Sequence, residues 1–131
     1  FNEKNNGLAM KELINKKLVK SAHDISSGGI IVSLVEMCLA GNVGAKIKIP
    51  HNKISQQEYL FGEDQSRYLV EVDNKNKEKV SKLLEKNNTY YEIIGRTQKE
   101  SFELHKEFSI KLSSLNKFNS FWFNNFFKDN K

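Results

Sequence analysis

The sequence predicts an α+β fold, with a mixed or antiparallel sheet and helices packed against one face. Two observations predict this class. Short segments in which apolar and polar residues alternate are separated by segments whose apolar residues recur at helical spacing. The spacers are too short for a regular parallel sheet. The 131 residues, of which 38% are hydrophobic and 11% aromatic, suit one domain with its own core.

The N-terminal half is expected to begin with a linker and then to alternate between helix and strand. Residues 1–6 are polar and indicate a linker from preceding domains, so the domain itself is expected to cover 7–131. An amphipathic helix is predicted over about 7–18. The short apolar segment 19–25 predicts a buried strand that runs into a loop. The most apolar helix is expected over 29–40, followed by a half-exposed strand over 43–49.

The C-terminal half continues the alternation. Residues 51–59 are polar and are expected to be helical or looped, and 67–72 alternate as a strand does. A surface helix is predicted over 75–86 and a strand over 90–97. The segment 102–112 suits one or two further strands.

The end of the chain predicts a helix with an unusual apolar surface. One stripe at helical spacing is more typical of a core than of a cofactor site, and consists of Leu115, Phe118, Trp122 and Phe126. Phe121, Phe123 and Phe127 cannot share that face, which suggests docking on another domain. The chain begins at Phe1 rather than Met, which indicates a piece of a longer polypeptide.

Composition limits the classes of partner and site. The net charge is +5 and the pI is near 9.2, but the lysines are dispersed with no dense basic run, so nucleic-acid binding is not expected. No apolar run approaches the roughly 18 residues of a membrane span. The single cysteine, Cys38, rules out a disulfide or a cysteine metal site within the chain and favours a reducing compartment, the cytoplasm. His51 and His105 lie in polar surroundings and are expected at the surface.

The first candidate site is the sequence SAHDISSGGI, residues 21–30, directly ahead of the most apolar helix. A helix N-terminus presents backbone N–H groups and a positive dipole end, and glycines allow a phosphate to approach the backbone closely. A simpler interpretation is that a serine caps the helix and the glycines only permit a tight turn. The candidate residues for a nucleotide or phosphate are His23, Asp24, Ser26, Ser27, Gly28 and Gly29.

The second candidate site is the sequence LFGEDQSRY, residues 60–68, on a turn that opens a strand. Glu63, Gln65 and Arg67 can converge there with Asp64. We expect Arg67 to pair with Glu63 or Asp64, because their spacing allows an arginine–carboxylate contact. An internally paired turn with no ligand is the alternative.

These two motifs, about forty residues apart and in this order, resemble the C-terminal domain of the AIR-synthase-related superfamily. Within it they are most similar to the phosphoribosylformylglycinamidine synthase family, where they usually read HDVSDGGL and LFGEDQxRY. The resemblance runs from about residue 7 to residue 127. The family usually has an aspartate where this chain has Ser27, which weakens any expectation of a metal or a ribose hydroxyl there.

The resemblance implies part of an ATP-dependent synthetase of purine biosynthesis. Such an enzyme converts formylglycinamide ribonucleotide and glutamine-derived ammonia to formylglycinamidine ribonucleotide, with ATP and Mg²⁺ as cofactors. Its catalytic histidine and magnesium carboxylates lie in earlier domains, so this domain is expected to hold no catalytic residue and no metal. Glu63 and Gln65 would line an auxiliary or vestigial nucleotide site, or stabilise a domain interface. The implied partners are the upstream domains and a glutaminase subunit or domain, with no nucleic acid and no membrane.

Two alternatives remain at this point. The chain could belong to another ATP-using member of the superfamily: aminoimidazole ribonucleotide synthase, thiamine monophosphate kinase, selenophosphate synthetase or the hydrogenase maturation protein. It could also be a non-catalytic interaction module with a basic surface and an aromatic tail. Nucleotide-induced thermal shifts and an RNA pulldown would distinguish a synthetase domain from such an interaction module.

Overall fold

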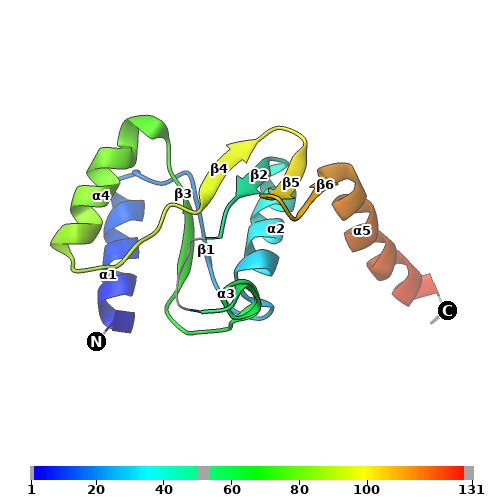
Figure 1. Ribbon diagram of the computed structural model, residues 1–131, viewed down its shortest axis with the longest axis horizontal. Helices are drawn as coiled ribbons and strands as arrows, with labels where there is room; N and C mark the ends of the chain where they lie inside the picture. The colour runs from blue at the N-terminus through cyan, green and yellow to red at the C-terminus, as the bar shows by residue number, and fades with distance from the viewer. Residues whose placement is uncertain (1, 50–53, 129–131) are drawn as a thin grey trace. The chain divides into compact units, whose positions relative to one another are not determined.

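The computed structural model describes residues 2–49 and 54–128, and it has the expected α+β architecture (Figure 1). The chain divides into two compact units. Helix α2 (Gly29–Gly41) contributes its residues up to Leu34 to unit 1 and the rest to unit 2. The other elements of unit 1 are α1 (Asn2–Asn15), β1 (Ser21–Asp24), α3 (Gln56–Phe61), β3 (Tyr68–Glu71), the 3₁₀-helix η1 (Asn74–Asn76) and α4 (Lys77–Lys86).

The core of unit 1 lies between α1 and α4, which run side by side in Figure 1. Each helix places small or branched apolar residues at helical spacing on one face, and these faces pack together because burial removes apolar surface from water. The buried residues of this core are Ala9, Leu13, Val80, Leu83 and Leu84.

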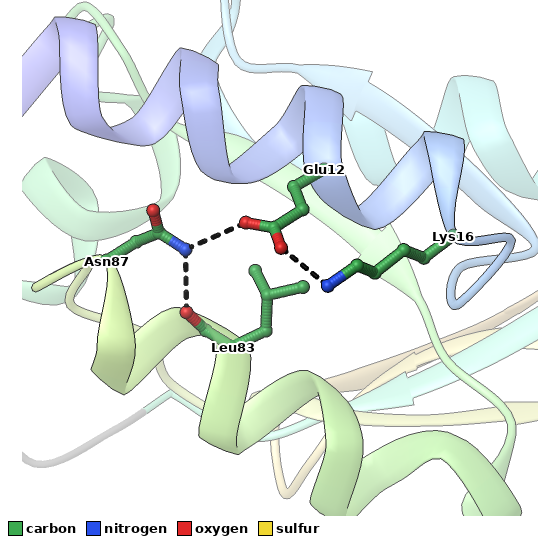
Figure 2. A network of polar contacts seen from close by, with 4 residues as sticks. All are labelled: Glu12, Lys16, Leu83 and Asn87. Carbon is green, nitrogen blue, oxygen red and sulfur yellow. Dashed lines mark hydrogen bonds and ion pairs between the residues drawn. The ribbon is translucent and has the colours of Figure 1, made fainter.

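A polar network joins the same two helices at the end of α4 (Figure 2). The Asn87 amide donates to Leu83 O at 2.9 Å and to Glu12 Oε2 at 3.2 Å, and Glu12 Oε1 pairs with Lys16 Nζ at 2.6 Å. Hydrogen bonds from Lys16 and then from Asn87 hold the pKa of Glu12 below its ordinary value. The network therefore favours the charged carboxylate at the seam between the helices.

Strands β1 and β3 form a two-stranded antiparallel sheet in unit 1, in which His23 pairs with Leu69 and Asp24 with Tyr68. The expectation of a buried strand over 19–25 was wrong for β1. Its residues Ser21, Ala22 and Asp24 are exposed and His23 is half-buried, because a sheet of only two strands leaves both edges uncovered.

Unit 2 contains a mixed four-stranded sheet in the order β4-β2-β5-β6. Its strands are β2 (Gly44–Ile47), β4 (Gly95–Gln98), β5 (Ser101–Leu104) and β6 (Phe108–Lys111). Strand β2 runs parallel to β5, and the other pairs are antiparallel. Strand β2 lies between two neighbours and is more buried than the half-exposed strand expected over 43–49. Ile47, Phe102 and Leu104 are buried in this unit.

Two expected boundaries were wrong. Helix α1 begins at Asn2, before the helix start expected at about residue 7. The strand expected over 90–97 begins only at Gly95. Tyr90 is 80% exposed and Ile93 is 63% exposed, and the side chain of Glu92 instead accepts hydrogen bonds from the Tyr59 and Tyr90 hydroxyls. Residues 90–93 therefore precede the strand, and backbone pairing begins with Ile94 O, which accepts from Lys48 N at 2.8 Å.

The terminal helix α5 (Leu112–Lys128) follows β6 and leaves much of its aromatic surface exposed. Phe118 is 72% exposed and Phe126 is 54% exposed, so the expectation that these two stripe residues form a core was wrong within this chain. The side chains of Trp122, Phe123 and Phe127 lie outside the described part of the structure, as does His51. Among the described residues, no helix combines the length and the hydropathy needed to cross a membrane.

Candidate functional site

The two sequence motifs meet at one end of the β1–β3 ribbon in unit 1. The first motif continues from the end of β1, and the second leads into the start of β3. The antiparallel pairing of Asp24 with Tyr68 brings these two ends together, and Ile25 N donates to Arg67 O at 2.9 Å just beyond the ribbon. Sheet register therefore places both turns side by side.

A direct hydrogen bond joins the two turns. Gly28 N donates to Glu63 Oε1 at 2.8 Å, across 35 residues of sequence. An open hollow of about 470 Å³ lies at this junction. It is lined by Glu3, Asp24, Ile25, Ser26, Ser27, Glu63, Gln65, Ser66, Arg67 and Tyr68. Most of the expected site residues thus lie around a single hollow.

His23, Gly28 and Gly29, although expected at the site, do not line the hollow. His23 is half-buried on β1, with Nδ1 2.6 Å from Asp24 O and 3.6 Å from Asp24 Oδ1. Gly28 takes part through its N–H, which is bound by Glu63.

Gly29 has a structural reason to be glycine. Its φ is +71°, and a Cβ there would lie 2.5 Å from Leu60 O. The backbone at the end of α3 occupies the space beside it. The simpler interpretation, a tight turn, therefore accounts for Gly29 without a ligand. The buried Ser33 strengthens the same turn, because its hydroxyl donates to Asp24 O at 3.2 Å.

Helix α3 positions the second motif. A capping box begins the helix, because Ser55 Oγ accepts from Glu58 N at 3.2 Å while Ser55 N donates to Glu58 Oε2 at 2.8 Å. Hydrogen bonding from the Ser55 backbone, and then from its side chain, holds the pKa of Glu58 below its ordinary value. The helix ends at Phe61, within the second motif, and Gly62 is its C-cap.

Arg67 closes the second motif on itself. Its Nη2 donates to Gly62 O and lies 3.3 Å from Asp64 Oδ2. The prediction that Arg67 pairs with Glu63 or Asp64 is confirmed for Asp64, and Glu63 instead turns toward the first motif. The guanidinium is therefore already engaged by the turn that carries it.

The electrostatic character of the hollow differs from that of a simple phosphate cradle. Its lining brings the carboxylates of Glu3, Asp24 and Glu63 together with the guanidinium of Arg67. Within the part of the chain that the structure describes, no group of three metal-binding side chains is found. The arrangement suits hydrogen bonding to hydroxyl groups at least as well as binding of a free anion.

The sequence analysis missed the contribution of α1. Glu3 lines the hollow, and the Asn6 side-chain amide donates to Ser66 O at 2.8 Å. Both residues lie in the polar segment expected to be a linker. Their only sequence signal is the spacing of three, which places them on one helix face once the segment is known to be helical.

Comparison with known protein families identifies the family of this chain. Residues 1–106 match the family model described as AIR synthase related protein, C-terminal domain. The chain belongs to this family. The match takes in both motifs and leaves α5 outside it.

The relatives by sequence are subunits of one enzyme. The phosphoribosylformylglycinamidine synthase subunit PurL of Pelagibacter ubique is 40% identical over 129 residues, which is 98% of this chain and 18% of that protein. The corresponding subunit of Rhodopseudomonas palustris is 33% identical over 120 residues, or 92% of this chain and 16% of that protein. The chain thus spans about a sixth of the length of these relatives.

Solved structures share the fold. Thermotoga maritima PurL complexed with FGAR superposes with a TM-score of 0.74 at 20% identity, over 86% of this chain and 20% of that one. The structure of PurLQS from the same organism gives a TM-score of 0.73 at 18% identity, over 84% of this chain and 21% of that one. This likeness bears out the α+β fold that the sequence predicts.

Proposed function

We propose that this chain is the C-terminal domain of a phosphoribosylformylglycinamidine synthase subunit of the PurL type. The intact enzyme would use ATP to convert formylglycinamide ribonucleotide and glutamine-derived ammonia to formylglycinamidine ribonucleotide. The observation that carries the proposal is the Gly28–Glu63 hydrogen bond, which joins the two motifs of the resemblance around one hollow. Identity of 40% along almost the whole chain supports it independently.

The role proposed for the hollow is auxiliary binding of a nucleotide or phosphate ester, not catalysis. Asp24, Ser26, Ser27 and Gln65 offer acceptors and donors at its surface. Glu63 and Arg67 are engaged within the protein, so they shape the hollow and hold its walls. His23, Gly28 and Gly29 do not line the hollow, and Gly28 contributes through its hydrogen bond to Glu63. Serine at position 27, where the family usually has aspartate, favours a ligand held without a metal at that position.

The groups that carry the chemistry are proposed to lie in the remainder of the synthetase. ATP and Mg²⁺ would act there, since phosphoryl transfer needs metal ions that bridge the phosphates. The chain's partners would be the upstream domains and a glutaminase that supplies ammonia. The exposed Phe118 and Phe126 of α5 are proposed to pack on those domains. The buried single cysteine, Cys38, supports a cytoplasmic location.

A product assay tests this division of roles. The purified 131-residue chain is incubated with formylglycinamide ribonucleotide, ATP, Mg²⁺ and ammonia. A parallel sample adds the upstream part of the Pelagibacter ubique subunit. We expect product only in the second sample. Substrate-dependent turnover by the chain alone, above that of a His23→Ala control, would contradict the proposal and would place catalysis at His23 and Asp24.

A further inference from the structure

The first two turns of α1 contribute to the hollow, although they lie outside both sequence motifs. Glu3 lines the hollow, and Asn6 lies one turn later on the same helix face. The half-buried Asn6 amide donates to Ser66 O at 2.8 Å, a contact that joins residues 60 positions apart. A segment with the composition of a linker therefore contacts the centre of the second motif.

Ser66 has a backbone conformation that needs support. Its φ is +64°, in the left-handed region that is unfavourable for a residue with a Cβ. Among the described residues, its buried hydroxyl oxygen has no hydrogen-bond partner, and neither has Nε of the adjacent Arg67. The Asn6 bond to the Ser66 carbonyl therefore compensates for a strained peptide whose side-chain hydroxyl contributes no hydrogen bond.

Two successive carbonyls of this turn are fixed from two different segments. Ser66 O accepts from Asn6 on α1, and Arg67 O accepts from Ile25 N beyond β1. Gln65 and Arg67 stand on either side of Ser66 and both line the hollow. Because Ser66 lies between them, a change in its backbone dihedrals changes the direction of the Gln65 side chain relative to that of Arg67.

We propose that Asn6 is a positioning residue of this site. Through the Ser66 carbonyl it fixes the directions in which Gln65 and Arg67 enter the hollow. The proposal rests on the function proposed above for the hollow, a site for a nucleotide or phosphate ester, and assigns it a wall and a support from α1. The site is then incomplete without the first two turns of α1.

Three variants of the full chain test the role of the Asn6 donor. Asn6→Asp keeps the shape of the side chain but cannot donate, and Asn6→Gln keeps an amide donor. Asn5→Asp makes the same change in charge at the neighbouring position of the same helix and is the matched control. The measurements are ¹H–¹⁵N spectra, with amide hydrogen exchange of residues 65–68 and the side-chain signals of Gln65 and Arg67, and the denaturant midpoint of each variant.

The expected result is local. Asn6→Asp shifts the side-chain signals of Gln65 and Arg67 and speeds exchange of the turn by roughly three- to tenfold, the range for loss of one hydrogen bond. Asn6→Gln restores most of the side-chain signals and of the slow exchange, and Asn5→Asp changes neither the signals nor the exchange rate. A merely structural role of Asn6 in α1 would not be rescued in this pattern, because it would alter the core amides near Leu13 and Leu83 as much as the turn.

Three outcomes would overturn the proposal. They are Asn6→Asp spectra that match those of Asn5→Asp, failure of Asn6→Gln to restore the turn, and changes in the α1–α4 core as large as those in the turn. The experiment measures no turnover. A failure of the proposed enzymatic function would therefore show in the product assay alone and would leave this result standing.

Discussion

Gly29→Ala tests the close approach between the turn after β1 and the end of α3. At φ +71° an alanine costs about 1 to 2 kcal/mol in backbone strain. Its Cβ would also lie 2.5 Å from Leu60 O and 2.7 Å from Phe61 C and Cα. These are backbone atoms that cannot rotate away, so overpacking adds about 1 to 3 kcal/mol. The free energy of unfolding should fall by about 2 to 5 kcal/mol in total.

Guanidinium-induced unfolding followed by circular dichroism measures this loss, and two other glycines provide controls. Gly28→Ala has a similar φ of +82°, and its Cβ would lie 2.4 Å from Cγ2 and 2.9 Å from Cβ of Val32. These atoms belong to one side chain rather than to the backbone of another element, so a small shift relieves them and we expect a loss of about 1 to 3 kcal/mol, smaller than at Gly29. Gly7 lies in α1, where an added Cβ would have no neighbouring atom within 4 Å, so Gly7→Ala should stabilise by up to about 1 kcal/mol. A loss at Gly29 no larger than at Gly28 would refute the close-packing argument.

Further substitutions are expected to change the free energy of unfolding by different amounts in the same assay. Arg67→Ala should cost about 1 to 2 kcal/mol because Gly62 O loses a charged donor, whereas Asp64→Asn should cost less than about 0.5 kcal/mol because the Asp64 side chain is 76% exposed. Ser55→Ala should cost about 1 kcal/mol through loss of the α3 cap. The pKa of Glu58 is lowered in the fold from 4.5, so the contribution of its carboxylate to stability is present above about pH 4.5 and is lost as the pH falls through the folded pKa. A Glu58→Gln variant whose stability falls with acid in the same way would contradict this. Phe118→Ala should change stability by less than about 0.5 kcal/mol because the ring is 72% exposed, and a loss above 2 kcal/mol would show that it is packed.

Local signals in the sequence predicted much of the fold. The helix expected over 29–40 is α2, Gly29–Gly41, because a glycine pair precedes it and its apolar residues keep helical spacing. The strand expected over 67–72 is β3, Tyr68–Glu71. The Arg67–Asp64 pair was also predictable, since three residues of separation on a turn allow the contact.

The rest depended on tertiary contacts that one sequence does not contain. The exposure of β1 follows from its place in a two-stranded sheet, and the burial of β2 from its place between two neighbours. The Gly28–Glu63 bond requires the β1–β3 register, and the Asn6–Ser66 bond requires α1 to begin at Asn2. The polar composition of residues 2–6 does not predict a helix, because the contacts of Glu3 and Asn6 with the second motif are tertiary and local propensity does not contain them.

Domain replacement in a full-length synthetase tests most directly whether this chain is the proposed C-terminal domain. The chain replaces the matching 129-residue segment of the Pelagibacter ubique PurL subunit, to which it is 40% identical. A parallel hybrid carries the segment of Rhodopseudomonas palustris, which is 33% identical to this chain. ATP-dependent formation of formylglycinamidine ribonucleotide is then measured, with circular dichroism and gel filtration to verify folding. We expect the hybrid with this chain to form product at a rate within about tenfold of that of the parallel hybrid. A folded hybrid that forms no product, beside an active parallel hybrid, would contradict it.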